Sequence, residues 1–194
     1  MTKFDLMTSV ETPVERRTFL KSGLTLSAAA ALSIGSVTPA LALPSGGEYR
    51  ISLKNAHTNE TFTGTYRVGN KYLPQAFERI NYVLRDFRAN EIFPIDPRTI
   101  DIIAIVHKMT GSNAPYSVLS GYRNARTNAM LREGSKGVAK HSLHMVGQAI
   151  DVRMENVSIA RIRDLAKKLH AGGVGYYPRS DFVHMDSGDF RTWG

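Results

Sequence analysis

Twelve consecutive residues in the second half of the chain constrain its fold and chemistry more than any other stretch. This segment, residues 140–151, reads KHSLHMVGQAID and contains two histidines, His141 and His144, and one carboxylate, Asp151. Its last residues are small and apolar and run into Val152, a pattern typical of a short buried strand. The segment therefore brings Asp151 to the end of a buried element a few residues after two imidazoles.

A third histidine, His184, lies in a second strand-like run, residues 182–186. Because side chains alternate along a strand, His184 and Asp186 share one face of it. Two imidazoles and one carboxylate, with a position left for water, make up a catalytic zinc set, whereas structural zinc sites are more often closed by four protein ligands. The spacing by itself leaves other interpretations open. A histidine in an apolar strand is often a packed core residue, and Asp151 can also hydrogen-bond a neighbouring turn.

Composition narrows the kind of site that is possible. The chain contains no cysteine, so it forms neither a disulfide nor a thiolate metal site. Any metal must bind nitrogen and oxygen ligands, which suits histidine and aspartate. A length of 194 residues fits one ordinary domain with its own core. The formal charge of +8 favours polyanionic partners in general.

The first 42 residues have the character of an export signal. Residues 15–21, ERRTFLK, resemble a twin-arginine signal, and the apolar stretch at about 23–34 is too short to span a bilayer as a mature helix. Residues 40–42, Ala-Leu-Ala, fit the small-x-small cleavage rule and predict a mature chain that begins near Leu43. The alternative is an uncleaved amphipathic anchor. Export to a periplasm makes cell wall, not DNA, the acidic polymer nearby, so we expect no nucleic-acid partner and no stable membrane insertion after cleavage.

The mature chain, residues 43–194, shows strand and helix patterns within one domain. The expected elements are a hairpin of strands 49–53 and 61–68, helices at 73–89, after Pro97, at 124–132 and from Ser158, and strands at 116–119, 147–152, 174–177 and 182–186. His57, in the hairpin turn, is expected to face solvent, and His107 to pack as a structural histidine. These patterns predict an α+β fold.

Several separated blocks of the sequence resemble one family. The pattern Ser142-x-His144-x-x-Gly147-x-Ala149-x-Asp151 resembles the signature of the zinc D-alanyl-D-alanine metallopeptidases, whose fold is shared with lysostaphin and hedgehog domains. The block SGYR at 120–123 resembles an upstream element of that family. Three further blocks resemble its murein endopeptidase K branch; they are KHSLHM at 140–145, GVGYYP at 173–178 and FVHMD at 182–186. The resemblance covers about residues 48–194. It implies a single α+β domain in which a small antiparallel sheet carries the metal site and helices pack on one side.

The resemblance also implies a ligand set and a general base. His144, Asp151 and His184 would hold one Zn²⁺ per chain, with water in the fourth position. Relatives in this family place an acidic residue three positions before the last histidine ligand, and here that residue is Asp181. We therefore expect Asp181 to be the general base, with His141 as the alternative proton shuttle.

Two further residues have expected supporting roles. Arg123 follows a glycine at a strand exit, and its planar guanidinium matches an oxyanion or a substrate carboxylate. The alternative is a surface arginine that caps the next element. Asp186 is a candidate partner that orients a ligand ring by a hydrogen bond.

The activity that the resemblance implies is hydrolysis of cross-links between peptidoglycan stem peptides, including those that join two meso-diaminopimelate residues. Tyr122, Tyr176, Tyr177 and Arg179 are candidates to line the substrate groove. One alternative is a D,D- or L,D-carboxypeptidase that trims stem peptides. Another is a wall-binding module with a vestigial zinc site.

Overall fold

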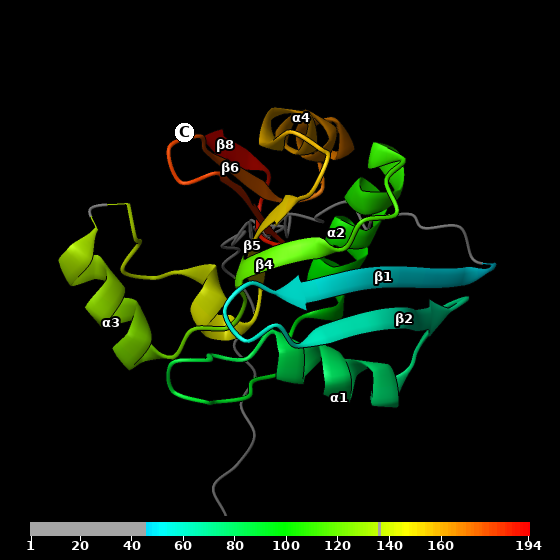
Figure 1. Ribbon diagram of the computed structural model, residues 1–194, viewed down its shortest axis with the longest axis horizontal. Helices are drawn as coiled ribbons and strands as arrows, with labels where there is room; N and C mark the ends of the chain where they lie inside the picture. The colour runs from blue at the N-terminus through cyan, green and yellow to red at the C-terminus, as the bar shows by residue number, and fades with distance from the viewer. Residues whose placement is uncertain (1–45, 136) are drawn as a thin grey trace, which may run out of the picture. The chain divides into compact units, whose positions relative to one another are not determined.

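The structure is a computed structural model, and we describe residues 46–135 and 137–194 of it (Figure 1). The predicted signal, residues 1–42, lies outside the described residues. None of the helices in the described part combines the length and the apolar character that crossing a membrane requires.

The described strands form one sheet of eight, in the order β3-β2-β1-β4-β5-β7-β6-β8. Their bounds are β1 Glu48–Asn55, β2 Thr61–Val68, β3 Lys71–Tyr72, β4 Tyr116–Ser120, β5 Ala149–Met154, β6 Gly173–Tyr177, β7 Phe182–Asp186 and β8 Arg191–Trp193. The predicted hairpin is β1 and β2, which pair antiparallel. The pairs β1–β4 and β6–β8 are parallel, so the sheet is larger than expected and mixed. Strands β5 and β7, which carry Asp151 and His184, pair antiparallel as expected.

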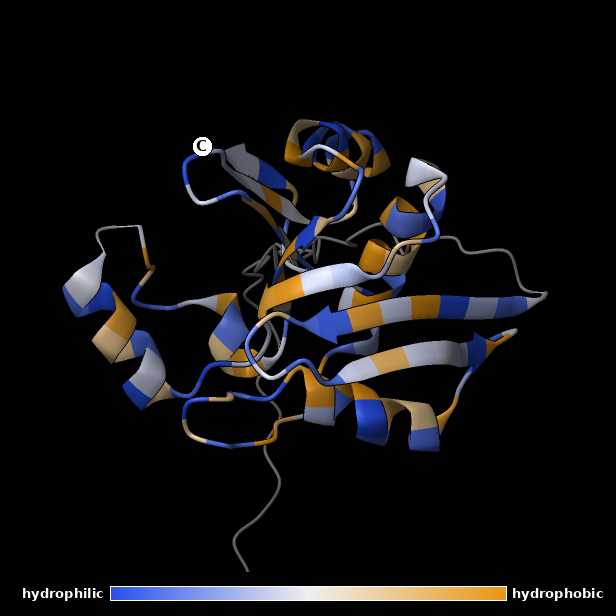
Figure 2. Cartoon of the chain, viewed as in Figure 1, coloured by the Kyte–Doolittle hydropathy of each residue, from blue (hydrophilic) through white to orange (hydrophobic). Residues whose placement is uncertain are grey.

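Three helices and the sheet enclose the core. They are α1 Pro74–Val83, α2 Pro97–Thr110 and α4 Ile159–Leu169, and all three contribute to one hydrophobic cluster with the central strands. Figure 2 shows the corresponding stripes of hydrophobic and hydrophilic residues along the strands and around the helices. The fourth helix, α3 Ala125–Gly134, lies apart from the sheet (Figure 1). The expected α+β class, with helices against one side of the sheet, is confirmed.

Along β5, side chains alternate between the hydrophobic core and the opposite face of the sheet, which carries Asp151. Ile150 and Val152 on β5 are fully buried in the core cluster. Each buried side chain of this kind stabilises the fold by roughly 1.5–3 kcal/mol. Asp151, between them, points to the opposite face. The apolar residues that hold β5 in the sheet therefore also fix the direction of its carboxylate.

Helix α1 ends at Val83, six residues before the predicted end at Ala89. The next residues form a tight loop in which Asp86 and Glu91 pair through their backbones at 2.9 and 3.1 Å. The Asp86 carboxylate accepts the backbone N–H groups of Arg88 and Ala89. A short acidic side chain that bonds nearby amides in this way competes with helix continuation.

A buried carboxylate, Asp101, connects α2 to β2 and β3. It accepts hydrogen bonds from the hydroxyls of Tyr66 at 2.8 Å and Tyr72 at 2.6 Å, and its other contact is a 3.0 Å ion pair with Arg67. We expect Asp101→Asn to lower the free energy of unfolding by about 3–5 kcal/mol, because it leaves the buried Arg67 guanidinium without a counter-charge. Urea denaturation followed by circular dichroism measures this loss.

The matched control replaces the acidic residue of an ion pair on the surface. Asp164 pairs with Arg163 on the surface of α4, and its side chain is 63% exposed. Asp164→Asn is expected to change stability by less than about 1 kcal/mol. Equal stability changes for the two variants would contradict the assigned role of Asp101.

Candidate metal centre

His144 is positioned by a short 3-10 helix, η1 Leu143–Val146, and by the glycine that ends it. Gly147 has a φ of +68°, and a Cβ there would overlap the carbonyl oxygen of Pro94. The His144 ring donates from Nδ1 to the carbonyl oxygen of Gly121 at 2.7 Å. This bond fixes the tautomer and leaves Nε2 as the available ligand atom. The Gly147 of the sequence pattern is thus a steric requirement of the turn that presents His144.

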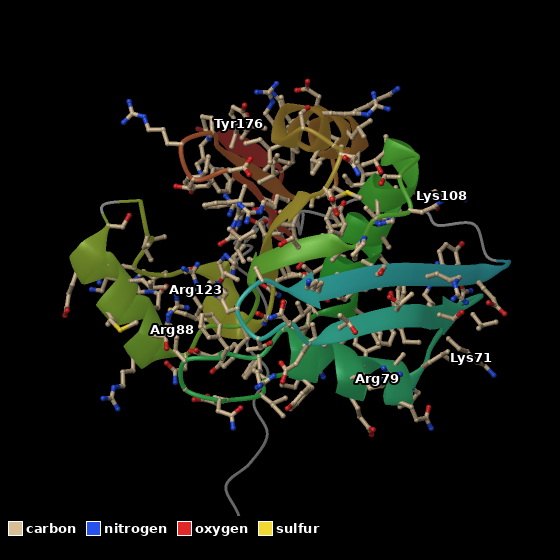
Figure 3. All side chains as sticks on the ribbon, in the orientation of Figure 1. Lys71, Arg79, Arg88, Lys108, Arg123 and Tyr176 are labelled. Carbon is tan, nitrogen blue, oxygen red and sulfur yellow. The ribbon has the colours of Figure 1, made fainter. Side chains whose placement is uncertain are left out.

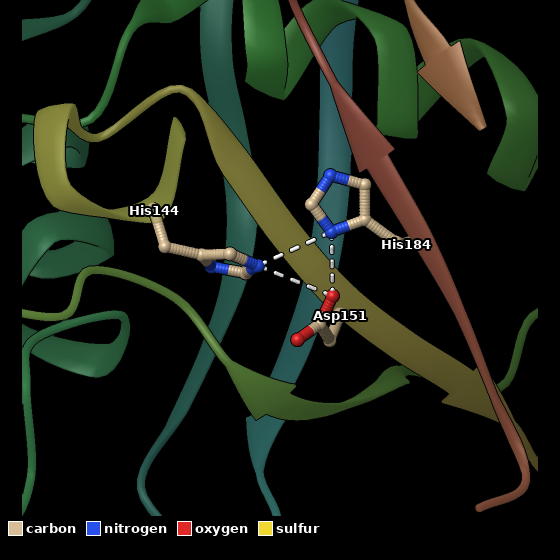
Figure 4. A group of neighbouring side chains, drawn as sticks. All are labelled: His144, Asp151 and His184. Atoms are coloured by element: carbon tan, nitrogen blue, oxygen red, sulfur yellow. Dashed lines mark hydrogen bonds and ion pairs between the residues drawn. The ribbon is translucent and has the colours of Figure 1, made fainter. Parts of the chain in front are cut away.

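Asp151 and His184 lie directly opposite each other on the paired strands β5 and β7. The Nδ1 atom of His184 is 2.8 Å from Oδ1 of Asp151, and the His144 Nε2 atom is 3.2 Å from each of these two atoms (Figure 4). Residues separated by 40 positions in the sequence therefore converge on one point. All three residues are buried, with at most 9% of each residue's surface exposed.

The geometry of the three donor atoms fits a small tetrahedral cation. Ligand atoms at about 2.0–2.2 Å from a tetrahedral zinc lie about 3.3–3.6 Å apart, slightly farther apart than the 2.8–3.2 Å observed here. Within the described ranges, no fourth histidine, cysteine or acidic residue joins this set. A three-residue nitrogen and oxygen set is typical of a catalytic rather than a structural zinc site.

Asp186 holds the other side of the His184 ring. Its carboxylate accepts from His184 Nε2 at 3.0 Å and is itself fixed by Arg191 at 2.7 Å and by the backbone N–H of Gly173 at 2.9 Å. Burial works against its ionised form, but His184 and Arg191 lower the pKa of Asp186 to about 2. The expected ring-orienting contact is therefore present, and it leaves His184 Nδ1 directed at the centre.

The electrostatics of the centre favour bound positive charge. Burial lowers the pKa of His144, so its ring is neutral at pH 7. Burial also opposes a charged His184, but its two carboxylate partners, Asp151 and Asp186, raise the pKa of His184 to about 9. The pKa of Asp151 lies below its usual range because the two imidazoles outweigh the effect of burial. A divalent cation can replace the extra proton that the His184 ring holds at pH 7, and its binding would release that proton.

The three donor atoms lie on the wall of an open groove of about 540 Å³. We call it the central groove; its lining includes His57, Arg88, Arg123, Leu131, residues 137–139 and 141–144, Asp151, Tyr177, Phe182, His184, Arg191 and Trp193. Residues from α3 and the segment before η1 contribute to this lining, as do residues from β6, β7 and β8. A peptide bound in the groove can therefore contact α3 on one side and strands β6–β8 on the other while it lies next to the three donor atoms.

Arg123 extends into the central groove from the residues that follow β4. It is 9% exposed, its backbone N–H donates to the carbonyl oxygen of His144 at 3.2 Å, and a terminal nitrogen is 3.4 Å from the Ser142 hydroxyl. Burial lowers the pKa of this guanidinium, and the nearby Asp151 acts in the opposite direction. In the described part of the chain, its Nε atom has no hydrogen-bond partner. The buried fork is thus available to an acceptor on a bound molecule.

The two candidates for the general base lie in different places. Asp181 sits in the turn between β6 and β7 with a φ of +52°, and its side chain is 64% exposed and pairs with Arg153 at 3.3 Å. It does not line the central groove, whereas His141 does. The structure therefore brings His141, but not Asp181, to the cavity that holds the candidate ligands.

The aromatic lining of the groove differs from expectation. Tyr122 is buried, stacks on Phe93 and donates to Glu91, and it does not line the groove. Tyr177 does line the groove, and its hydroxyl accepts a 2.8 Å bond from the indole of Trp193. Strand β8, which carries this tryptophan, was not predicted, because three residues are too few to show strand alternation.

The remaining two groove candidates also lie outside the lining. Tyr176 lies beneath the Arg163 guanidinium at 4.4 Å, and Arg179 is exposed in the turn after β6. Of the four residues proposed from the sequence, Tyr177 alone is in the set that lines the central groove.

Comparison with known proteins decides the family. Residues 44–193 match the family model described as peptidoglycan L,D-endopeptidase MepK. The chain belongs to the MepK family. It is 43% identical over 157 residues to the peptidoglycan L,D-endopeptidase MepK of Escherichia coli strain K12, an alignment that covers 80% of this chain and 86% of that protein.

A second relative supports the same assignment. The probable peptidoglycan L,D-endopeptidase MepK of Haemophilus influenzae is 39% identical over 144 residues, which cover 74% of this chain and 77% of that protein. The family and the hydrolase class that the sequence blocks predicted are confirmed. The His-Asp-His group of this MepK family member also agrees with a metal-dependent peptidase.

Proposed function

We propose that this MepK family member is a zinc-dependent endopeptidase that hydrolyses L,D cross-links between peptidoglycan stem peptides. The observation that carries the proposal is the convergence of three ligand atoms on the wall of an open groove. Relatives named peptidoglycan L,D-endopeptidases support the choice of substrate. We also propose that residues 1–42 direct export to the periplasm, by the twin-arginine route, and that residues 43–194 are the mature enzyme.

In this proposal His144, Asp151 and His184 hold the metal. Bound zinc would supply a Lewis acid and lower the pKa of water from about 15.7 to about 7. Asp186 keeps the His184 ring in the orientation that directs Nδ1 at the centre. The buried positions of the three side chains keep the ligand geometry preorganised before substrate arrives.

His141 is the proton shuttle that the groove geometry supports. It is exposed at the groove wall, three residues before His144. An imidazole is the commonest side chain for accepting a proton from attacking water and passing it to a leaving amine. Its place in the lining favours it over Asp181, which the sequence comparison ranked first.

Arg123 is the residue that would stabilise the developing oxyanion. We expect Arg123→Met to lower kcat by about 10²–10³-fold, because a preorganised donor to a tetrahedral intermediate typically contributes this much. Steady-state hydrolysis of a purified cross-linked muropeptide measures the change, and metal analysis of the same sample checks that the centre is intact. Arg123→Lys retains the charge but not the planar fork, so only partial recovery is expected. Full activity in the methionine variant would exclude the role.

The test of the proposed function is a digest with the mature protein, residues 43–194. Cross-linked muropeptides are incubated with the protein as purified, after chelation, and after zinc is returned, and the products are analysed by mass spectrometry. Conversion of L,D-linked dimers to monomers that requires zinc supports the proposal. Release of one terminal residue from monomers would support a carboxypeptidase instead. Wall binding that persists after chelation, without peptide products, would support a binding module.

A further inference from the structure

Two guanidinium groups face the central groove without an acidic partner. Arg88 and Arg123 both line the groove, and Figure 3 shows both in the region between α3 and the sheet. Neither forms an ion pair with any carboxylate in the described ranges. The third arginine of the lining, Arg191, is already bound to Asp186. Arg88 and Arg123 are therefore the arginines of this lining that remain available to a ligand.

The backbone holds the two arginines in a defined relation. One oxygen of the buried Asp86 carboxylate accepts the N–H of Arg88 at 3.1 Å, and the other accepts the N–H of Asn124 at 3.0 Å. Asn124 directly follows Arg123. A single carboxylate thus connects the loop that presents Arg88 to the segment that presents Arg123.

The other acid of this loop, Glu91, is also already engaged. Glu91 accepts from the hydroxyl of Tyr122 at 2.8 Å and from the side-chain amide of Asn124 at 2.7 Å. These bonds hold the Glu91 carboxylate between two groups of the scaffold. Both acids of the loop, Asp86 and Glu91, therefore bond other groups, and neither forms an ion pair with the Arg88 guanidinium.

The Arg88 side chain rests on an aromatic support. Its guanidinium carbon lies 4.3 Å from the centre of the Phe87 ring, which stacks on His57 at 4.2 Å. His57 is exposed as expected, but its Nε2 atom also bonds the carbonyl oxygen of Leu119 at 3.0 Å. A guanidinium on a ring face keeps its N–H edges free for an acceptor.

We propose that Arg88 is a specificity-determining residue that binds a free carboxylate on the substrate residue beside the scissile bond, while the neighbouring Arg123 remains the proposed donor to the oxyanion. This inference rests on the proposed function. Arginine forks bind carboxylates through paired, charge-assisted hydrogen bonds. A cross-link between diaminopimelate residues carries such a carboxylate outside the peptide main chain, whereas its amidated form has the same shape without the charge.

The experiment compares two synthetic L,D-linked dimers that differ only in this group, a free carboxylate in one and a carboxamide in the other. We expect the wild-type enzyme to prefer the acid by about tenfold or more in kcat/KM, since a hydrogen bond to a charged group is worth roughly that factor. Arg88→Met should abolish most of the preference, mainly through a higher KM for the acid. The carboxamide should be cleaved at nearly the same rate by both proteins.

Arg79→Met is the matched control. Arg79 is also exposed and lies over an aromatic ring, Phe62, but it is outside the central groove (Figure 3). The control loses the same charge and a similar ring contact. Because Arg79 does not line the groove, this variant should keep the wild-type preference for the acid over the carboxamide. If Arg88→Met keeps the full preference, or if Arg79→Met loses it equally, the inference is overturned.

A binding measurement separates this inference from the proposed function. The affinities of both dimers are measured by calorimetry with the zinc-loaded protein carrying His141→Gln, with and without Arg88→Met. Tighter binding of the acid that depends on Arg88 supports the inference even if the digest shows no hydrolysis. Equal affinity for acid and carboxamide overturns it even if hydrolysis is observed.

Discussion

Replacing His184 with alanine is expected to remove the bound metal and to lower kcat/KM by more than about 10³-fold. The substitution removes one of three ligands, and two remaining donors hold zinc far more weakly than the three-residue set of a catalytic site. It also leaves the carboxylates of Asp151 and Asp186 without the imidazole that now lies between them. Elemental analysis after dialysis and hydrolysis of a cross-linked muropeptide measure the two losses on one sample.

A histidine outside the centre provides the control. His170 ends α4 with a φ of +54° and stacks on Phe190. Asparagine tolerates this left-handed conformation, so His170→Asn should fold normally and retain metal and activity. A His184→Ala protein that still bound one equivalent of zinc and cleaved substrate would show that the ligand assignment is wrong.

Replacing His141 with glutamine should reduce kcat by about 10²–10⁴-fold while the metal content stays at one equivalent. Glutamine can still hydrogen-bond water, but it cannot accept and return a proton, and general acid–base catalysis typically contributes a factor of this size. Because His141 is exposed, its substitution should leave the fold intact, and a thermal melt checks this directly. Single-turnover hydrolysis with zinc-loaded protein measures the effect on the chemical step.

Asp181→Asn is the companion variant, because Asp181 is the other candidate base. Its carboxylate is exposed and pairs with Arg153 outside the groove lining, so we expect less than about a threefold change in kcat. The opposite pattern, with a large loss for Asp181→Asn and a small one for His141→Gln, would assign the base to Asp181. If kcat fell by similar factors in both variants, the two side chains would share the transfer of the proton.

Much of the fold follows from local patterns. Hairpin β1–β2 and helix α2 lie where alternation, helical spacing and Pro97 predicted them. The helix predicted to run to Ala89 was too long because Asp86 bonds the amides of the next turn, a local side-chain interaction that outweighs the apolar spacing. The parallel pairing of β1 with β4 was not predicted, because pairing between strands far apart in sequence depends on how the intervening helices pack.

The sequence by itself determined which residues form the candidate metal centre. The pattern around His144 and Asp151 and the strand with His184 specify donor type, strand face and the glycine of the turn, all of which depend on short-range sterics and alternation. Only the tertiary structure decided which polar residues meet them in the groove. It placed His141 and Arg88 in the lining and Asp181 outside it, because the direction of a loop is determined by long-range packing and by hydrogen bonds such as those of Asp86.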